Sequence, residues 1–82
     1  MKYLDCVELI VEKESYAKEG VHKGMQGVIW LEESINGEWD VCFPQRGEKE
    51  DIAEISVREE DMRVIPVMNA TENERIKAEW GE

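Results

Sequence analysis

The order of apolar and polar positions along the chain predicts a series of short strands. Residues 5–12 are rich in β-branched and aliphatic side chains and predict a first strand of about seven residues. A long polar loop with two glycines follows over 13–24, and a second strand is expected over 26–32. Residues 38–43 alternate between polar and apolar, with Trp39, Val41 and Phe43 on one face. This alternation is typical of a strand that buries one side.

Turn signals separate these strands and the ones that follow. Asn36-Gly37 predicts a type I′ hairpin turn, because both central residues of that turn need a positive φ. Pro44 ends the third strand, and residues 52–57 predict a fourth, with a slip in the alternation near Ala53 that suggests a β-bulge. Residues 58–61 suit one turn of 3-10 helix, and residues 62–67 predict a short last strand ended by Pro66.

The pattern changes to that of a helix near the C-terminus. Thr71 and Glu74 have the spacing of a capping box before a helix over 72–80, and Ile76 and Trp80 share one face of it. A helix of about nine residues is unstable alone in water. We therefore expect Ile76 and Trp80 to dock on the chain's own strands or on another molecule. The predicted organisation is a β domain over 1–67 and a tail with a short helix over 68–82.

Five strands with a long first loop, a tight hairpin and a 3-10 turn before the last strand predict a mainly β fold, a small antiparallel barrel. This order resembles the SH3-like barrel, through residues 23–28 at the second strand, the Asn36-Gly37 turn and residues 57–62. The resemblance covers about residues 5–66 and is nearest to small stand-alone SH3-like proteins of bacteria. The segment 20–28, with Lys23, Gly24 and Gly27, is similar to the KOW motif of ribosomal and transcription-elongation proteins.

Charge is distributed unevenly over the 82 residues. The net charge is −10, and residues 32–61 hold eleven of the twenty carboxylates against three bases, a local net of −8. A concentrated acidic surface repels nucleic acid and anionic membranes and attracts basic proteins. We therefore expect a basic protein as the partner, rather than nucleic acid or a membrane.

No segment approaches the ~18 apolar residues of a membrane span, and residues 1–5 lack the apolar run of a signal peptide, which favours a cytoplasmic location.

Catalytic and metal-binding chemistry has little support in the sequence. His22 is the single histidine and is expected in an exposed loop with no nucleophile nearby. Cys6 and Cys42 each lie in an apolar run, where they are expected as buried small side chains that could pair only if their strands were adjacent. The sequence predicts no enzymatic activity, no cofactor and no metal site.

The expected function follows from the acidic surface. We predict a non-catalytic protein-binding module that neutralises a basic protein, in its most specific form an immunity or inhibitor protein for a toxin that acts on nucleic acid. The alternative is a KOW-like accessory of RNA, the ribosome or transcription. The carboxylates are expected in two patches, because the hairpin tip of an SH3-like barrel lies away from its 3-10 turn. The predicted partner-binding residues are Glu32, Glu33, Glu38, Asp40, Glu48, Glu50, Asp51, Glu59, Glu60, Asp61 and Trp30. The oligomeric state is left open.

Overall fold

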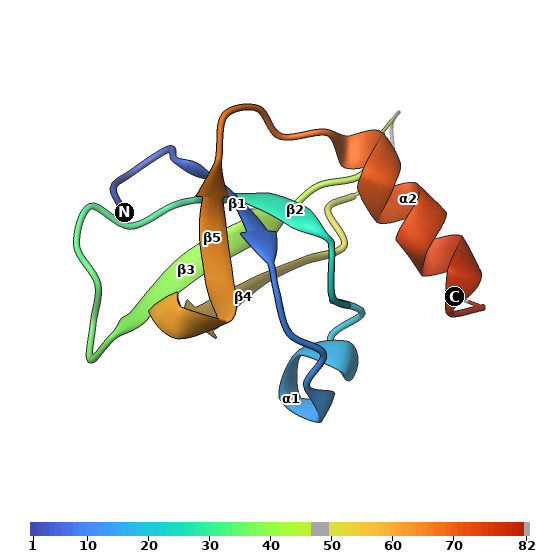
Figure 1. Ribbon diagram of the computed structural model, residues 1–82, viewed down its shortest axis with the longest axis horizontal. Helices are drawn as coiled ribbons and strands as arrows, with labels where there is room; N and C mark the ends of the chain where they lie inside the picture. The colour runs from blue at the N-terminus through green and yellow to red at the C-terminus, as the bar shows by residue number, and fades with distance from the viewer. Residues whose placement is uncertain (47–49, 82) are drawn as a thin grey trace.

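The structure, a computed structural model, describes residues 1–46 and 50–81 (Figure 1). Five strands form one antiparallel sheet in the order β4-β3-β2-β1-β5. The strands are β1 (Cys6–Leu9), β2 (Gln26–Ile29), β3 (Glu38–Phe43), β4 (Ala53–Arg58) and β5 (Met62–Ile65). The other elements are α1 (Glu14–Ala17), the 3-10 turn η1 (Glu59–Asp61) and α2 (Ala70–Glu79). The fold is therefore mainly β with a short C-terminal helix, as predicted. In the described part of the chain, β4 and β5 are the two edges of the sheet.

One apolar core lies on the inner side of the sheet. Trp39, Val41 and Phe43 of β3 all enter it, which confirms the buried face that the alternation predicts. The long first connection also contributes to the core, through Tyr16 and Val21. This connection is therefore packed against the sheet and contains the helix α1, where the sequence predicts only loop.

The turn between β2 and β3 has the predicted geometry. Asn36 and Gly37 have φ values of 54° and 79°, and Ile35 and Glu38 exchange two backbone hydrogen bonds of 2.9 and 3.0 Å. Near the end of β2 that lies away from this turn, a Cβ atom at Gly27 would lie 2.5 Å from the Cys42 carbonyl oxygen. Only glycine allows β2 and β3 to approach this closely.

The fourth strand contains the predicted irregularity. Its pairing with β3 runs from Glu38 opposite Arg58 to Phe43 opposite Ala53. The Ile52 N–H also donates to the Phe43 carbonyl at 2.8 Å. Two successive residues thus oppose Phe43, which is the arrangement of a β-bulge. Both Ile52 and Ala53 pack against the core as a result.

The first two strands are shorter than predicted, and the residues after the first one make other contacts. Residues 10–12 leave the ladder after β1, and Glu12 accepts hydrogen bonds from the Lys23 N–H and from Nδ1 of His22, both at 2.8 Å. Glu12 thereby ties the start of the long connection to its end. His22 is buried, so the prediction of an exposed loop histidine is wrong.

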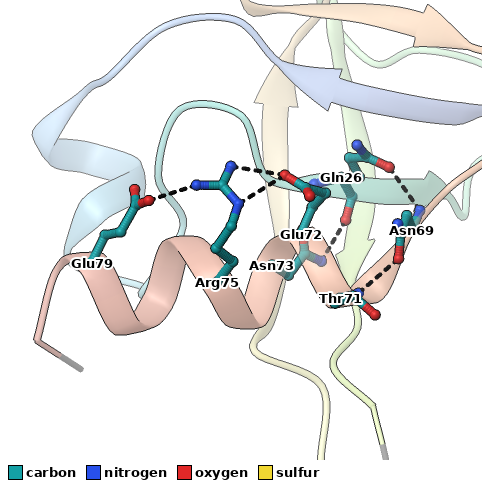
Figure 2. A network of polar contacts seen from close by, with 7 residues as sticks. All are labelled: Gln26, Asn69, Thr71, Glu72, Asn73, Arg75 and Glu79. Atoms are coloured by element: carbon teal, nitrogen blue, oxygen red, sulfur yellow. Dashed lines mark hydrogen bonds and ion pairs between the residues drawn. The ribbon is translucent and has the colours of Figure 1, made fainter.

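Helix α2 begins two residues earlier than predicted and has a different cap. Asn69, rather than Thr71, is the N-cap, and its side-chain oxygen accepts the Thr71 N–H at 3.0 Å (Figure 2). An asparagine cap satisfies a backbone donor that the first helical turn leaves open. In Figure 1 the helix lies at the far side of the molecule from the N-terminus.

The helix docks on the chain's own sheet, which settles the alternative that the sequence left open. Asn73 is fully buried, and its side chain donates to the Gln26 and Pro44 carbonyls, each at 2.7 Å, and accepts the Gln26 N–H at 2.6 Å. Ile76 belongs to the core. Trp80 stacks on His22 with ring centroids 4.1 Å apart, although 54% of Trp80 stays exposed.

Candidate functional site

The three carboxylates of η1 are each bound to groups of the same chain. Glu59 accepts the indole N–H of Trp39 at 2.9 Å. Glu60 accepts from Nε of Arg58 at 2.6 Å. Asp61 accepts from Nζ of Lys13 at 2.6 Å and from the Tyr16 hydroxyl at 2.7 Å. These carboxylates therefore connect η1 to β3, to β4 and to the long first connection.

Asp61 is the most deeply embedded of the predicted site residues. It is buried, so the expectation that it lies on a presented acidic surface is wrong. Burial by itself would raise the pKa of Asp61, but the hydrogen bonds from Lys13 and Tyr16 outweigh it and hold the pKa below the ordinary value of 3.8. Burial and the neighbouring Asp61 carboxylate raise the pKa of Tyr16 to about 12, so the hydroxyl stays a hydrogen-bond donor.

The hairpin tip and η1 lie next to each other, which corrects the expectation that they are far apart. The Glu59 N–H donates to the Gly37 carbonyl at 3.0 Å. Glu38 lies opposite Arg58, whose guanidinium also binds Glu60. Arg58 thus offsets carboxylates of both predicted patches where they meet.

A second group of carboxylates lies on the outward side of the sheet. Residues that lie opposite each other on antiparallel strands point to the same side. One row runs from Val28 through Cys42 to Glu54, and the next from Asp40 to Ser56. Because the Trp30 N–H donates to the Asp40 carbonyl at 2.9 Å, Trp30 extends the second row. We call the surface formed by Tyr3, Trp30, Asp40, Asp51 and Glu54 the sheet face.

The carboxylates of the sheet face differ from those of η1 in what they contact. Asp40 accepts from the Ser56 hydroxyl at 3.1 Å, and Asp51 accepts from the Cys42 thiol at 3.0 Å. Within residues 1–46 and 50–81, no ion pair involves Asp40, Asp51 or Glu54. Asp51 and Glu54 are exposed and Asp40 is half-buried, and none of the three is paired with a cation of the described chain.

Cys42 lies beneath the sheet face and interacts with three of its residues, Trp30, Asp51 and Glu54. Burial and the hydrogen bond to Asp51 raise the pKa of the thiol to about 11, and Glu54 adds to this rise, while a hydrogen bond with Trp30 opposes it. A thiol with such a pKa is protonated at neutral pH and is a poor nucleophile. Cys42 and Cys6 are separated by β2, because both lie opposite Val28, so they are too far apart for a disulfide.

Two aromatic side chains form the apolar part of the sheet face. Trp30 is 46% exposed and Tyr3 is 41% exposed, and their ring centroids lie 5.9 Å apart with a tilt of 57°. The segment that carries Tyr3 is held in place by the Leu4 N–H, which donates to the Ile29 carbonyl at 2.8 Å. Trp30, one of the predicted partner-binding residues, is thus on the exposed face, while the inward-facing Trp39 belongs to the core.

The remaining predicted site residues lie around the sheet face or outside the described structure. Glu32 and Glu33 are exposed in the connection between β2 and β3. Glu50 and Asp51 line an open cavity of about 360 Å³, but Lys77 lines it as well, so this cavity carries both signs of charge. Glu48 lies outside the described residues.

Two residues of the sheet face, Tyr3 and Glu54, are not among the partner-binding residues that the sequence predicts. Glu54 follows from alternation, because Ala53, Ile55 and Val57 face inward and leave the residues between them pointing outward. Tyr3 had no usable signal, since its contact with Trp30 depends on the path of the N-terminal segment. In the part of the chain that the structure describes, no group of His, Cys, Asp and Glu side chains could hold a metal ion.

Comparison of the chain with protein-family models, with curated proteins and with solved structures gives no match. Among the described helices, none is long and apolar enough to cross a membrane.

Proposed function

We propose that the chain is a non-catalytic protein-binding module whose sheet face binds and neutralises a basic protein. We also propose that the fold is an SH3-like barrel. The strand order β4-β3-β2-β1-β5, the Asn36-Gly37 hairpin and the turn η1 before β5 support this interpretation. The module would then offer a rigid β surface for recognition, with function supplied by the residues on it.

The observation that carries the proposal is the contrast in charge pairing. Asp61 and Glu60 of η1 are paired with Lys13 and Arg58, whereas Asp40, Asp51 and Glu54 have no cation among the described residues. Asp51 and Glu54 are exposed and Asp40 beside them is half-buried. Exposed carboxylates attract a positively charged surface at long range and form charge-assisted hydrogen bonds on contact. The exposed Trp30 beside them adds apolar area of the kind found at the centre of protein interfaces.

The specific form of the proposal is an immunity or inhibitor protein for a toxin that acts on nucleic acid. An enzyme of that kind needs a basic cleft to bind phosphates. A small protein with a net charge of −10 that sets carboxylates on a rigid sheet is suited to occupy such a cleft. The proposed place of action is the cytoplasm.

The test is an affinity capture with a charge variant as its comparison. The protein is immobilised and exposed to bacterial cytoplasm, and bound proteins are eluted by raising salt from about 0.05 to 0.5 M, where exposed charges are strongly screened. The same capture is made with the triple variant Asp40→Asn, Asp51→Asn, Glu54→Gln. A matched triple variant on the helices, Glu14→Gln, Glu72→Gln, Glu79→Gln, changes the net charge equally.

We expect a basic protein that binds the wild type and the helix variant, elutes with salt, and is lost with the sheet-face variant. The purified partner is then assayed for nuclease activity with and without the chain, and inhibition supports the immunity form. If the two triple variants capture the same proteins, the proposal is contradicted.

The KOW-like alternative stays a prediction. The glycines of the motif have structural roles here, because Gly24 has a φ of 93° and Gly27 lies against the Cys42 carbonyl. The Lys23 N–H is occupied by Glu12. A gel-shift assay with single- and double-stranded RNA at low salt tests the alternative, and a shift at micromolar protein would favour it over the proposed function.

A further inference from the structure

We propose that Tyr3 and Trp30, with the carboxylates beside them, form a binding site for arginine side chains of an extended segment of the partner. This inference rests on the proposed function and specifies what the sheet face recognises. The occupant is a basic strand-like peptide segment that lies across β2, β3 and β4, with arginines at alternate positions.

The aromatic pair has the geometry of an open cation site. The rings are tilted by 57° with centroids 5.9 Å apart, and both side chains keep more than two fifths of their surface exposed. The rings are not in a parallel stack, and the exposed part of each side chain is open to a partner. A guanidinium within about 6 Å of such a ring is attracted by its quadrupole, and tryptophan is the strongest of the aromatic partners.

The backbone that presents Tyr3 has a left-handed residue directly after it. Leu4 has a φ of 70°, and the Asp5 N–H closes the turn on the Lys2 carbonyl at 3.1 Å. A leucine in this left-handed region is unusual, because its Cβ crowds the backbone. Despite the strain, 53% of Leu4 is exposed rather than packed in the core. Strain of this kind concentrates at functional surfaces.

The carboxylates are spaced for a row of arginines rather than for one. Asp40 is on the strand next to Trp30, and Glu54 is on the strand beyond it. Neighbouring strands are about 4.8 Å apart, so Trp30, Asp40 and Glu54 extend across a width of about 10 Å. Successive same-side residues of an extended peptide are about 7 Å apart. A segment crossing these strands can therefore place one guanidinium against the rings and the next against the carboxylates.

Arginine fits this surface better than lysine does. Its planar guanidinium stacks on aromatic rings and offers paired N–H donors to a carboxylate. Asp40 and Asp51 each use one oxygen for a contact with Ser56 or Cys42, which leaves the second oxygen of each carboxylate for a partner. The chain carries a net charge of −10, so two copies repel each other. A basic occupant is therefore favoured over a second copy of this chain.

The test uses two defined probes, a ten-residue peptide with alternating arginine and threonine and the same peptide with lysine. Dissociation constants are measured by calorimetry for the full-length wild type, for Trp30→Leu and for the sheet-face triple variant. Val67→Ala serves as a control for loss of an exposed apolar side chain away from the sheet face. Circular dichroism verifies that each variant is folded.

We expect the wild type to bind the arginine peptide about tenfold more tightly than the lysine peptide, a ratio that a cation–π contact of ~1.4 kcal/mol provides. Trp30→Leu should lose this preference while it keeps weak, salt-sensitive binding of both peptides. The triple variant should lose most binding of both. The Trp30 indole N–H resonance should shift on titration, and that of Trp80 should not.

Two results separate failure of this inference from failure of the proposed function. Equal affinity of wild type and Trp30→Leu for the arginine peptide would overturn the aromatic site, while salt-sensitive capture of a basic protein would still support the acidic module. Binding of neither peptide, together with no basic protein captured by the sheet face, would overturn both.

Discussion

The carboxylates of η1 and those of the sheet face occupy neighbouring parts of one small molecule but have opposite surroundings. Glu59, Glu60 and Asp61 accept hydrogen bonds from donors on β3, β4 and the first connection. Asp40 and Asp51 accept only from Ser56 and Cys42, and no ion pair of the described residues reaches them. In η1 the buried Asp61 connects distant parts of the fold, whereas Asp51 and Glu54 of the sheet face are exposed and have no ion pair among the described residues.

This difference matters because a local net charge is not a site. Eleven carboxylates over residues 32–61 suggest one or two binding patches. The structure divides them instead by cation pairing, because Asp61 and Glu60 of η1 are paired with Lys13 and Arg58, whereas no ion pair of the described residues involves Asp40, Asp51 or Glu54. Substitutions in η1 should change stability, and substitutions on the sheet face should change binding with little effect on stability.

The largest expected effect is on stability at Asp61. Asp61→Asn removes the charge that Lys13 and Tyr16 surround, and we expect unfolding to become easier by about 2 kcal/mol, the range for hydrogen bonds to charged groups. Glu54→Gln removes the same charge from the sheet face, where the change should stay within about 0.5 kcal/mol. Urea denaturation measures both. Equal losses for the two variants would remove the distinction between the regions.

The pH dependence of stability should also show the contribution of Asp61. The pKa of Asp61 in the folded chain lies below the ordinary value of 3.8. Its contribution is therefore fully present above the pKa of the unfolded chain and is lost as the pH falls through the folded pKa. The advantage of wild type over Asp61→Asn in urea midpoint should shrink below about pH 4. An advantage that persists at pH 2 would contradict the assignment.

A smaller effect is expected at the strained turn beside the sheet face. Leu4→Gly and Leu4→Ala remove the same exposed side chain, but only glycine adopts a φ of 70° without crowding. We expect Leu4→Gly to be more stable than Leu4→Ala by about 1 kcal/mol in thermal or urea unfolding. A glycine variant no more stable than the alanine variant would show that the turn stores no strain.

The smallest effect is on stability at low salt. The sheet-face triple variant removes three charges that repel one another, so it should be more stable than the wild type by about 0.5 kcal/mol at low ionic strength. The difference should vanish near 1 M salt, where the screening length is about 3 Å. A triple variant that is less stable at every salt concentration would place these carboxylates among the structural ones.

Much of the fold could be predicted because its signals are local. The Asn36-Gly37 turn, the inner face of β3 and the position of η1 follow from residues close together in the chain. Helix α2 was expected, but its cap moved to Asn69, because a capping box and a single asparagine cap give similar local patterns.

The two roles of the carboxylates could not be predicted, because they depend on distant contacts. The donors to Asp61 lie 48 and 45 positions away in the sequence. His22 is buried through contacts with Glu12 and with Trp80 of the C-terminal segment. Similarly, no local pattern brings Tyr3 to Trp30. Charge and alternation identify which residues face outward, but not which of them already have a partner.

The central claim is that the sheet face, and not η1 or the total charge, binds a basic partner. The most direct test is the dissociation constant of the alternating arginine peptide for wild type and for the two triple variants at about 0.1 M salt. We predict at least a tenfold loss for Asp40→Asn, Asp51→Asn, Glu54→Gln and less than about a twofold loss for Glu14→Gln, Glu72→Gln, Glu79→Gln. Equal losses for the two variants would show that only net charge matters and would contradict the account.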